Sequence, residues 1–334
     1  MWDDLVGAFR KVVGLLSVAE GRASASFDSA ISWVRATSAR TEFVKIEGDA
    51  ARMVGTIGFG FTTIDERLLT PPKREEFKAD VCRQVTRLAQ WAADMNWSAP
   101  AQPQLRVLVS DRYNISKSLV PVWSGRAGDM EFPVNRVASR EAAIAHELVH
   151  IFFPNGNRFL AEGLAVHAQA AIGSNPAFPN FGKALHALVR KQLLAKASTD
   201  PGADQLCLEQ VGLANLDAIP TPSRLNIRIG EKEFGPTFTY PIAGSFVQFL
   251  IERHGMEKFR ALYQQTPFEP LTRIAGSPDR WVKVYHVALA DLERDWKSMI
   301  ASGFPEAEHD EALEHSHLFD NPLQVDTGRE HLDA

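Results

Sequence analysis

Residues 142–153 read AAIAHELVHIFF and contain the pattern His-Glu-x-x-His at positions 146–150. If this segment is a helix, His146 and His150 lie one turn apart on the same face. Both imidazoles can then bind one Zn²⁺ ion, and Glu147 lies beside them, where it can act on a zinc-bound water without being a ligand. The neighbouring residues are apolar on nearly all sides, which is typical of a buried helix.

The flanking residues predict where this helix begins and ends. Ser139 is a plausible N-cap, and Glu141 falls in the first turn, where the helix dipole favours an acid. The sequence Pro-Asn-Gly at 154–156 is expected to end the helix. Two histidines and a glutamate are costly to bury without partners, and a metal ion is the simplest partner. The alternative is a pair of core histidines with ordinary hydrogen bonds.

A second apolar helix is expected from Arg158 to about Ile172, and its only acid is Glu162. The 11 residues between His150 and Glu162 leave room for a short turn between two packed helices. A lone carboxylate in an apolar helix needs a cation or a strong donor. One zinc ion would meet that need and give a His₂Glu site with an open position, as in catalytic zinc sites. The alternative is an ion pair with Arg158, four residues earlier.

The length, charge and cysteine content of the chain exclude several classes of function. The chain has 334 residues, enough for a large core and two subdomains, and its net charge of −5 argues against nucleic acid as a main partner. Cys82 and Cys207 lie far apart without metal-ligand spacing, so two free thiols are expected. No apolar run is long enough for a transmembrane helix. The acidic start of the chain, with charges interrupting its apolar part, predicts no export signal and therefore a cytoplasmic protein.

The order of predicted elements indicates an α+β fold. Strands are expected at 43–46, 54–61, 105–109, 120–124 and 129–134, with a helix at 73–96. Beyond the two metal helices, further helices are expected at 181–197, 203–213, 240–254, 256–265 and 278–301. The loop at 214–239 could be a lid over the site or a plain connector. We expect an N-terminal helical segment at 1–40, a sheet and zinc subdomain at 41–175, a helical subdomain at 176–304 and a disordered acidic tail at 305–334.

Three stretches carry a resemblance to a known family. They are HELVH at 146–150, FLAEGLAVHAQ at 159–169 and, less specifically, YPIAGSFVQFLIERHGMEKFRAL at 240–262. On these residues the chain resembles the gluzincin zinc metallopeptidases, in particular the peptidase MA-like group, which is distantly related to aminopeptidase N and thermolysin. The resemblance covers roughly residues 75–300.

The resemblance implies hydrolysis of peptide bonds with one Zn²⁺ ion bound by His146, His150 and Glu162. Glu147 would be the general base and then the general acid. Tyr240 stands where the family often has a tyrosine that donates to the oxyanion, although it could equally be an aromatic residue packed on its own helix. The family's Gly-x-Met-Glu-Asn motif does not occur in the sequence, so a typical aminopeptidase is not expected.

The resemblance also implies a small mixed β-sheet whose edge strand packs on the zinc-binding helix, followed by a mostly helical C-terminal subdomain. Ala127–Val134 looks like that edge strand, and it would bind a peptide or protein substrate as an added strand. The alternative function is a zinc-stabilised, non-catalytic module that binds peptides or regulates a partner. An intact Glu147 argues against that alternative, because a purely structural site does not need this acid. The oligomeric state cannot be predicted from these residues.

Overall fold

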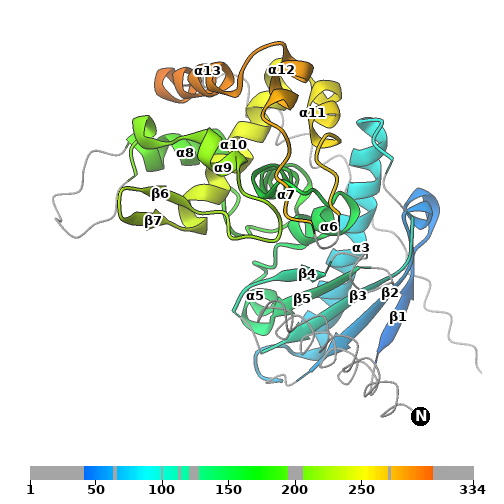
Figure 1. Ribbon diagram of the computed structural model, residues 1–334. Coiled ribbons are helices and arrows are strands. Elements are labelled where there is room, and N and C mark those ends of the chain that lie inside the picture. The colour runs from blue at the N-terminus through cyan, green and yellow to red at the C-terminus, as the bar shows by residue number, and fades with distance from the viewer. Residues whose placement is uncertain are drawn as a thin grey trace, which may run out of the picture.

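The computed structural model describes residues 41–62, 66–98, 101–111, 114–119, 128–194, 206–269 and 272–303. The predictions for 1–40 and 305–334 lie outside these ranges. The described chain confirms the α+β class, with a mixed sheet of five strands and a helical C-terminal region. Helices α6 (Ile144–Phe152) and α7 (Arg158–Ile172) lie between the sheet and that helical region (Figure 1).

The sheet has the strand order β1-β2-β3-β5-β4. The strands are β1 (Glu42–Lys45), β2 (Val54–Phe61), β3 (Gln102–Ser110), β4 (Lys117–Leu119) and β5 (Asp129–Pro133). The three central strands are parallel, and the outer strands β1 and β4 run antiparallel to their neighbours. Strands β4 and β5 form an antiparallel pair, and β4 covers 117–119, whereas the predicted strand at 120–124 falls outside the described residues. Residues 120–127 lie outside the described ranges.

The prediction that Ala127–Val134 is the edge strand is wrong. Strand β5 occupies this stretch and pairs with β3 on one side and with β4 on the other. The chain after β3 folds back along the outside of β5, so the short strand β4 becomes the edge. Helix α6 contacts both β4 and β5. An edge strand therefore does pack on the helix of the His-Glu-x-x-His motif, as expected, but it is β4.

Helix α3 (Pro71–Asp94) packs on one face of the sheet. Its buried residues include Phe77, Val81, Val85 and Leu88, which confirms the predicted apolar face. The ring of Phe77 meets the ring of Phe132 edge-on, with 5.6 Å between the centroids. Paired residues of the three central strands share this face and are buried: Ile57, Phe59, Leu105, Val107, Val109, Met130 and Phe132.

The helical C-terminal region differs from the prediction in its boundaries. Its helices are α8 (Leu185–Leu194), α9 (Leu213–Asp217), α10 (Pro236–His254), α11 (Met256–Tyr263), α12 (Asp279–Tyr285) and α13 (Leu289–Ser302). The predicted helix at 278–301 is two helices, because His286 adopts a left-handed conformation with φ of 63°. The described part of the predicted helix 203–213 contains a short 3₁₀ turn, Leu208–Gln210, and the first residue of α9. The predicted loop 214–239 contains a small hairpin of β6 (Ile227–Ile229) and β7 (Lys232–Phe234).

Helix α10 begins at Pro236, not at the predicted Tyr240–Pro241. Pro236 can take the first helical position because that residue's N–H has no partner within the helix. Pro241 lies inside the helix and has no N–H for the carbonyl of Thr237, four residues earlier. Gln192 of α8 donates to that carbonyl at 3.2 Å, so a side chain from a neighbouring helix replaces the missing bond.

The cysteines and the apolar character of the helices were both considered from the composition. Cys82 and Cys207 are free thiols, as expected. Among the described residues, no helix combines the length and the apolar character needed to cross a membrane.

Helices α7 and α10 cross at two glycines. A Cβ atom at Gly163 would lie 2.5 Å from Val247 Cγ2 and 2.7 Å from the carbonyl oxygen of Ala243. A Cβ atom at Gly244 would collide with the side chain of Val166. The two backbones can approach this closely only because neither position carries a side chain. Gly163 follows Glu162 directly, so the crossing sets the position of the residue expected to be the third metal ligand.

Replacing Gly163 with alanine is expected to destabilise the protein by about 1–3 kcal/mol, because the added methyl group overpacks the crossing. Helix propensity alone predicts the opposite sign, a gain of about 1 kcal/mol. Urea unfolding followed by circular dichroism measures the difference. A variant at least as stable as the wild type would show that α7 and α10 can separate without cost.

Candidate metal centre

Three predicted ligand residues meet in the structure. Nε2 of His146 lies 3.1 Å from Nε2 of His150 and 3.1 Å from Oε2 of Glu162. The third distance, between Nε2 of His150 and Oε2 of Glu162, is 3.4 Å. The side chain of Glu162 is only 1% exposed. These three atoms form a buried group that could hold a metal ion.

The size of this triangle fits a tetrahedral ion. Ligand bonds of about 2.0–2.1 Å, as at zinc, require about 3.3 Å between ligand atoms. Oε2 of Glu162 is buried and has no well-formed hydrogen bond within the described ranges, so a cation would satisfy it. Burial would raise the pKa of Glu162, but Arg158 and His150 hold that pKa well below its usual value. The carboxylate is therefore in its ligating, ionised form.

The alternative reading of Glu162, an ion pair with Arg158, also occurs. Nη2 of Arg158 lies 2.5 Å from Oε1 of Glu162. The two readings do not exclude each other, because each uses a different oxygen of the same carboxylate. One oxygen pairs with the guanidinium, and the other faces the two histidines.

Glu147 lies on α6 beside the two histidines and is 6% exposed. Burial lowers the pKa of His146, but Glu162 and then Glu147 raise it, so this pKa lies above its usual value. Glu147 is therefore coupled to His146 electrostatically, and it is not one of the three residues of the triangle.

The metal helix begins later than predicted. Ser139 follows the short helix α5 (Val134–Ala138) and is its C-cap, and α6 starts only at Ile144 after Ala143. Glu141 pairs with Arg136 at 2.6 Å instead of lying in the first turn of α6. The N-cap Ala143 has no side chain that could accept a hydrogen bond from the first-turn N–H groups.

Two glutamines from other helices accept those hydrogen bonds. The N–H of Ala145 donates to Oε1 of Gln84 on α3 at 3.0 Å, and the N–H of His146 donates to Oε1 of Gln169 on α7 at 3.2 Å. Both glutamines are buried. They hold the backbone of the first ligand against the two neighbouring helices. Neither glutamine is among the predicted site residues. Each is nevertheless a polar residue on an otherwise apolar helix face, which is the pattern that identified Glu162.

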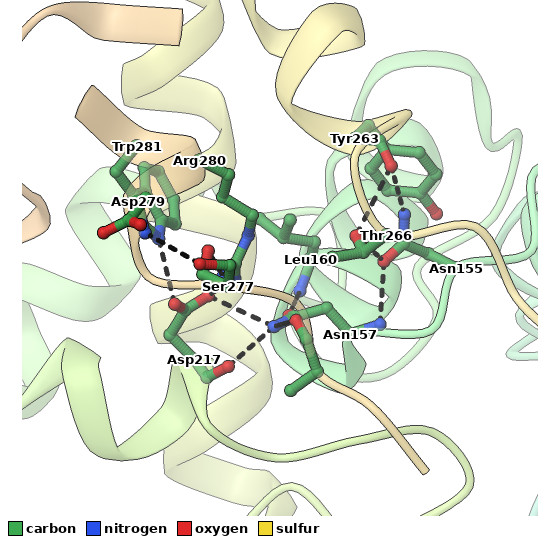
Figure 2. Close-up of polar contacts among 11 residues, drawn as sticks. Asn155, Asn157, Leu160, Asp217, Tyr263, Thr266, Ser277, Asp279, Arg280 and Trp281 are labelled. Carbon is green, nitrogen blue, oxygen red and sulfur yellow. Dashed lines mark hydrogen bonds and ion pairs between the residues drawn. The ribbon is translucent and has the colours of Figure 1, made fainter. Parts of the chain in front are cut away.

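The turn between the two metal helices is held by Asn155. Its Nδ2 donates to the carbonyl of Tyr263 at 2.7 Å, and its Oδ1 accepts from Thr266 Oγ1 at 2.8 Å (Figure 2). The same Oδ1 accepts from the N–H of Asn157 at 2.8 Å. Asn155 is 2% exposed, so these bonds form away from water. The C-terminal helical region thus determines the path of this turn.

Asn157 caps α7 and joins it to a buried ion pair. Its Oδ1 accepts from the N–H of Leu160 at 2.9 Å, and its Nδ2 lies 3.1 Å from Oδ1 of Asp217. Asp217 pairs with Arg280 and accepts from Nε1 of Trp281 at 2.9 Å (Figure 2). Because Asn157 caps the helix that carries Glu162, this network positions the third ligand from outside the site.

Tyr240 lies at the site, although its helix starts earlier than predicted. Its ring stacks on the ring of His146, with centroids 6.1 Å apart and planes at 15°. Its hydroxyl oxygen lies 3.2 Å from Nη2 of Arg158. Burial, with Glu162 adding to it, raises the pKa of Tyr240, so the hydroxyl keeps its proton. Tyr240 therefore packs on His146 and is not only an aromatic residue on its own helix.

His167 lies on α7, outside the triangle of His146, His150 and Glu162. Burial lowers its pKa to about 4. In the unfolded chain a histidine takes up a proton near pH 6.5. The unfolded state therefore binds more protons between these two values, and the folded state should lose stability as the pH falls from about 6.5 to 4. Urea midpoints at several pH values should show a smaller loss in His167→Gln than in the wild type, and equal losses would rule out His167 as a source.

A scan against protein-family models found no match for this sequence, and a search of curated proteins found none either. The gluzincin relationship therefore stays a prediction that rests on the motifs.

Proposed function

We propose that the protein is a zinc-dependent metallopeptidase. The observation that supports this most is the ligand triangle of His146, His150 and Glu162, with Glu147 beside it. Two imidazoles and one carboxylate are a donor set that suits zinc and leaves a fourth position open. The buried carboxylate of Glu162 and the short ligand-to-ligand distances favour zinc over a pair of ordinary core histidines.

In this proposal the metal ion, Glu147 and Tyr240 each have a separate role in the reaction. A zinc ion bound there would polarise the scissile carbonyl and make the attacking water more acidic. Glu147 accepts the proton of that water and then passes it to the leaving amine. Tyr240 donates to the developing oxyanion from the side of His146.

The expected binding position of the substrate changes, because the edge strand is β4 and not β5. A peptide that adds as a strand needs an outermost strand to pair with. On the side of α6 that strand is β4 and not β5. We therefore propose that an extended peptide pairs with β4, the edge strand in contact with the helix that carries His146 and His150.

Metal analysis combined with a peptide-library digest tests the proposal. The purified protein should contain about one zinc ion per chain, and it should cleave library peptides in a reaction that a chelator stops and added zinc restores. Cleavage that a chelator does not affect would contradict the proposal. Bound zinc with no cleavage of any peptide would favour the non-catalytic module instead.

A further inference from the structure

Arg158 contacts two parts of the candidate metal centre at once. Its Nη2 lies 2.5 Å from Oε1 of Glu162 and 3.2 Å from the hydroxyl oxygen of Tyr240. The ring of Tyr240 in turn stacks on His146. Arg158 therefore touches one predicted ligand directly and reaches a second through a tyrosine ring.

The contact with Glu162 determines how this carboxylate can bind a metal. A carboxylate binds through one oxygen or through both. Because Oε1 forms a charge-assisted bond with Arg158, only Oε2 faces the histidine nitrogens. A ligand that offers one oxygen occupies one coordination position and leaves the fourth position open. Loss of the guanidinium would free Oε1 to take that position.

The contact with Tyr240 determines which way its hydroxyl points. A guanidinium only donates, so the hydroxyl oxygen accepts from Arg158, and the hydroxyl proton is directed to the carboxylate of Glu162, which adds to burial in raising the pKa of Tyr240. Nδ1 of His146 is buried and lacks a hydrogen-bond partner in the described part of the chain. Histidines that bind zinc are usually oriented by such a partner. Here the ring of His146 is contacted by the ring of His150, with centroids 4.7 Å apart, and by the stacked ring of Tyr240, whose hydroxyl is bonded to Arg158.

Stability of the helix does not explain the arginine. Arg158 is the first residue of α7, where the helix dipole disfavours a positive charge. An Arg–Glu pair with the base four residues before the acid is also the weaker of the two orders. The helix dipole opposes a basic residue at this position, and the order of the pair gains less than the reverse order would, which points to a role at the site.

We propose that Arg158 is a positioning residue that keeps Glu162 a one-oxygen ligand and holds Tyr240 against His146. This inference rests on the metal site of the proposed function, but it concerns metal geometry and can be measured without a substrate. The reference variant is Arg158→Met. Arg136→Met is the matched control, because Arg136 forms an ion pair of 2.6 Å with Glu141, which is not part of the site.

Zinc affinity and the cobalt spectrum give the first test. Competition with a chromophoric chelator should show zinc binding about 10–100-fold weaker in Arg158→Met than in the wild type. Arg136→Met should bind zinc as the wild type does. With Co²⁺ in place of zinc, the visible bands should weaken in Arg158→Met, because a two-oxygen carboxylate raises the coordination number. Unchanged zinc affinity and an unchanged Co²⁺ spectrum in folded Arg158→Met would overturn the proposal.

Arg158→Lys keeps the test valid if the methionine variant does not fold. Lysine retains the charge but cannot bridge two partners in the fixed geometry of a guanidinium. The Co²⁺ spectrum of Arg158→Lys should therefore still differ from that of the wild type, and a spectrum identical to the wild type would count against the bridging role.

Rates of peptide hydrolysis, measured together with zinc binding, distinguish a failure of this inference from a failure of the proposed function. The effects of Arg158→Met and Tyr240→Phe on kcat should not add, since one residue acts through the other. Weakened zinc binding in a protein that cleaves no peptide would refute the peptidase and leave the inference standing. Cleavage with normal zinc affinity and an unchanged Co²⁺ spectrum in Arg158→Met would refute the inference and leave the peptidase standing. A wild-type protein that binds no zinc would refute both.

Discussion

Replacing Glu147 with glutamine is expected to lower peptide hydrolysis by about 10²–10⁴-fold, the usual contribution of a general base. Glutamine has nearly the same shape but cannot accept the proton of the attacking water. Glu147 lies outside the triangle formed by the two histidines and Glu162, so its loss should leave the bound zinc in place. Initial rates on a cleaved library peptide, with zinc content measured on the same sample, check both parts of this prediction.

Two further variants control this experiment. His146→Ala removes a vertex of the triangle and should lose both zinc and activity. Glu141→Gln changes an acid near the same helix that pairs with Arg136, and it should keep full activity. Full activity in Glu147→Gln would remove this residue from the mechanism, and loss of zinc in that variant would assign it a role in binding the metal.

Asp217→Ala is expected to destabilise the protein by about 3–5 kcal/mol, because it leaves a buried guanidinium without its counter-ion. The partner, Arg280, is only 2% exposed and cannot turn to water without opening the structure. The substitution also removes the acceptor of Trp281 and a contact of Asn157. Chemical denaturation with and without zinc would measure the loss.

An exposed ion pair of the same kind gives the comparison. Asp291 and Arg294 lie 2.6 Å apart with side chains 44% and 71% exposed. Asp291→Ala should therefore cost no more than about 1 kcal/mol. A double variant, Asp217→Leu with Arg280→Met, should recover much of the lost stability, since it leaves no unpaired charge. Equal losses for Asp217→Ala and Asp291→Ala would show that the buried pair has no special role.

The local parts of the site could be predicted from the sequence. The motif at 146–150 and the single acid in an apolar helix identified all three members of the triangle. Helix α7 spans Arg158–Ile172, as the apolar run and Gly173 indicated. The spacing of His146 and His150 follows from helix geometry alone. A pattern that acts within one helix can be read before the fold is known.

The parts that depend on distant residues could not be predicted. The edge of the sheet was assigned to the wrong strand, because strand order depends on pairing across the whole sheet. The start of α6 was placed at Ser139, because a local cap is the usual solution and here Gln84 and Gln169 supply the acceptors from other helices. The bridging role of Arg158 depends on Tyr240, which is 82 residues away in sequence.

The turn that Asn155 and Asn157 hold in place has a consequence for the order of folding. Its hydrogen-bond partners lie up to 118 residues further along the chain. These bonds cannot form before the later segments of the chain are present. His146 and His150 are brought together as soon as α6 forms, whereas the turn that leads to α7 and Glu162 gains its partners only from the C-terminal helical region. A chain emerging from the ribosome would thus complete the triangle only after that region has been made.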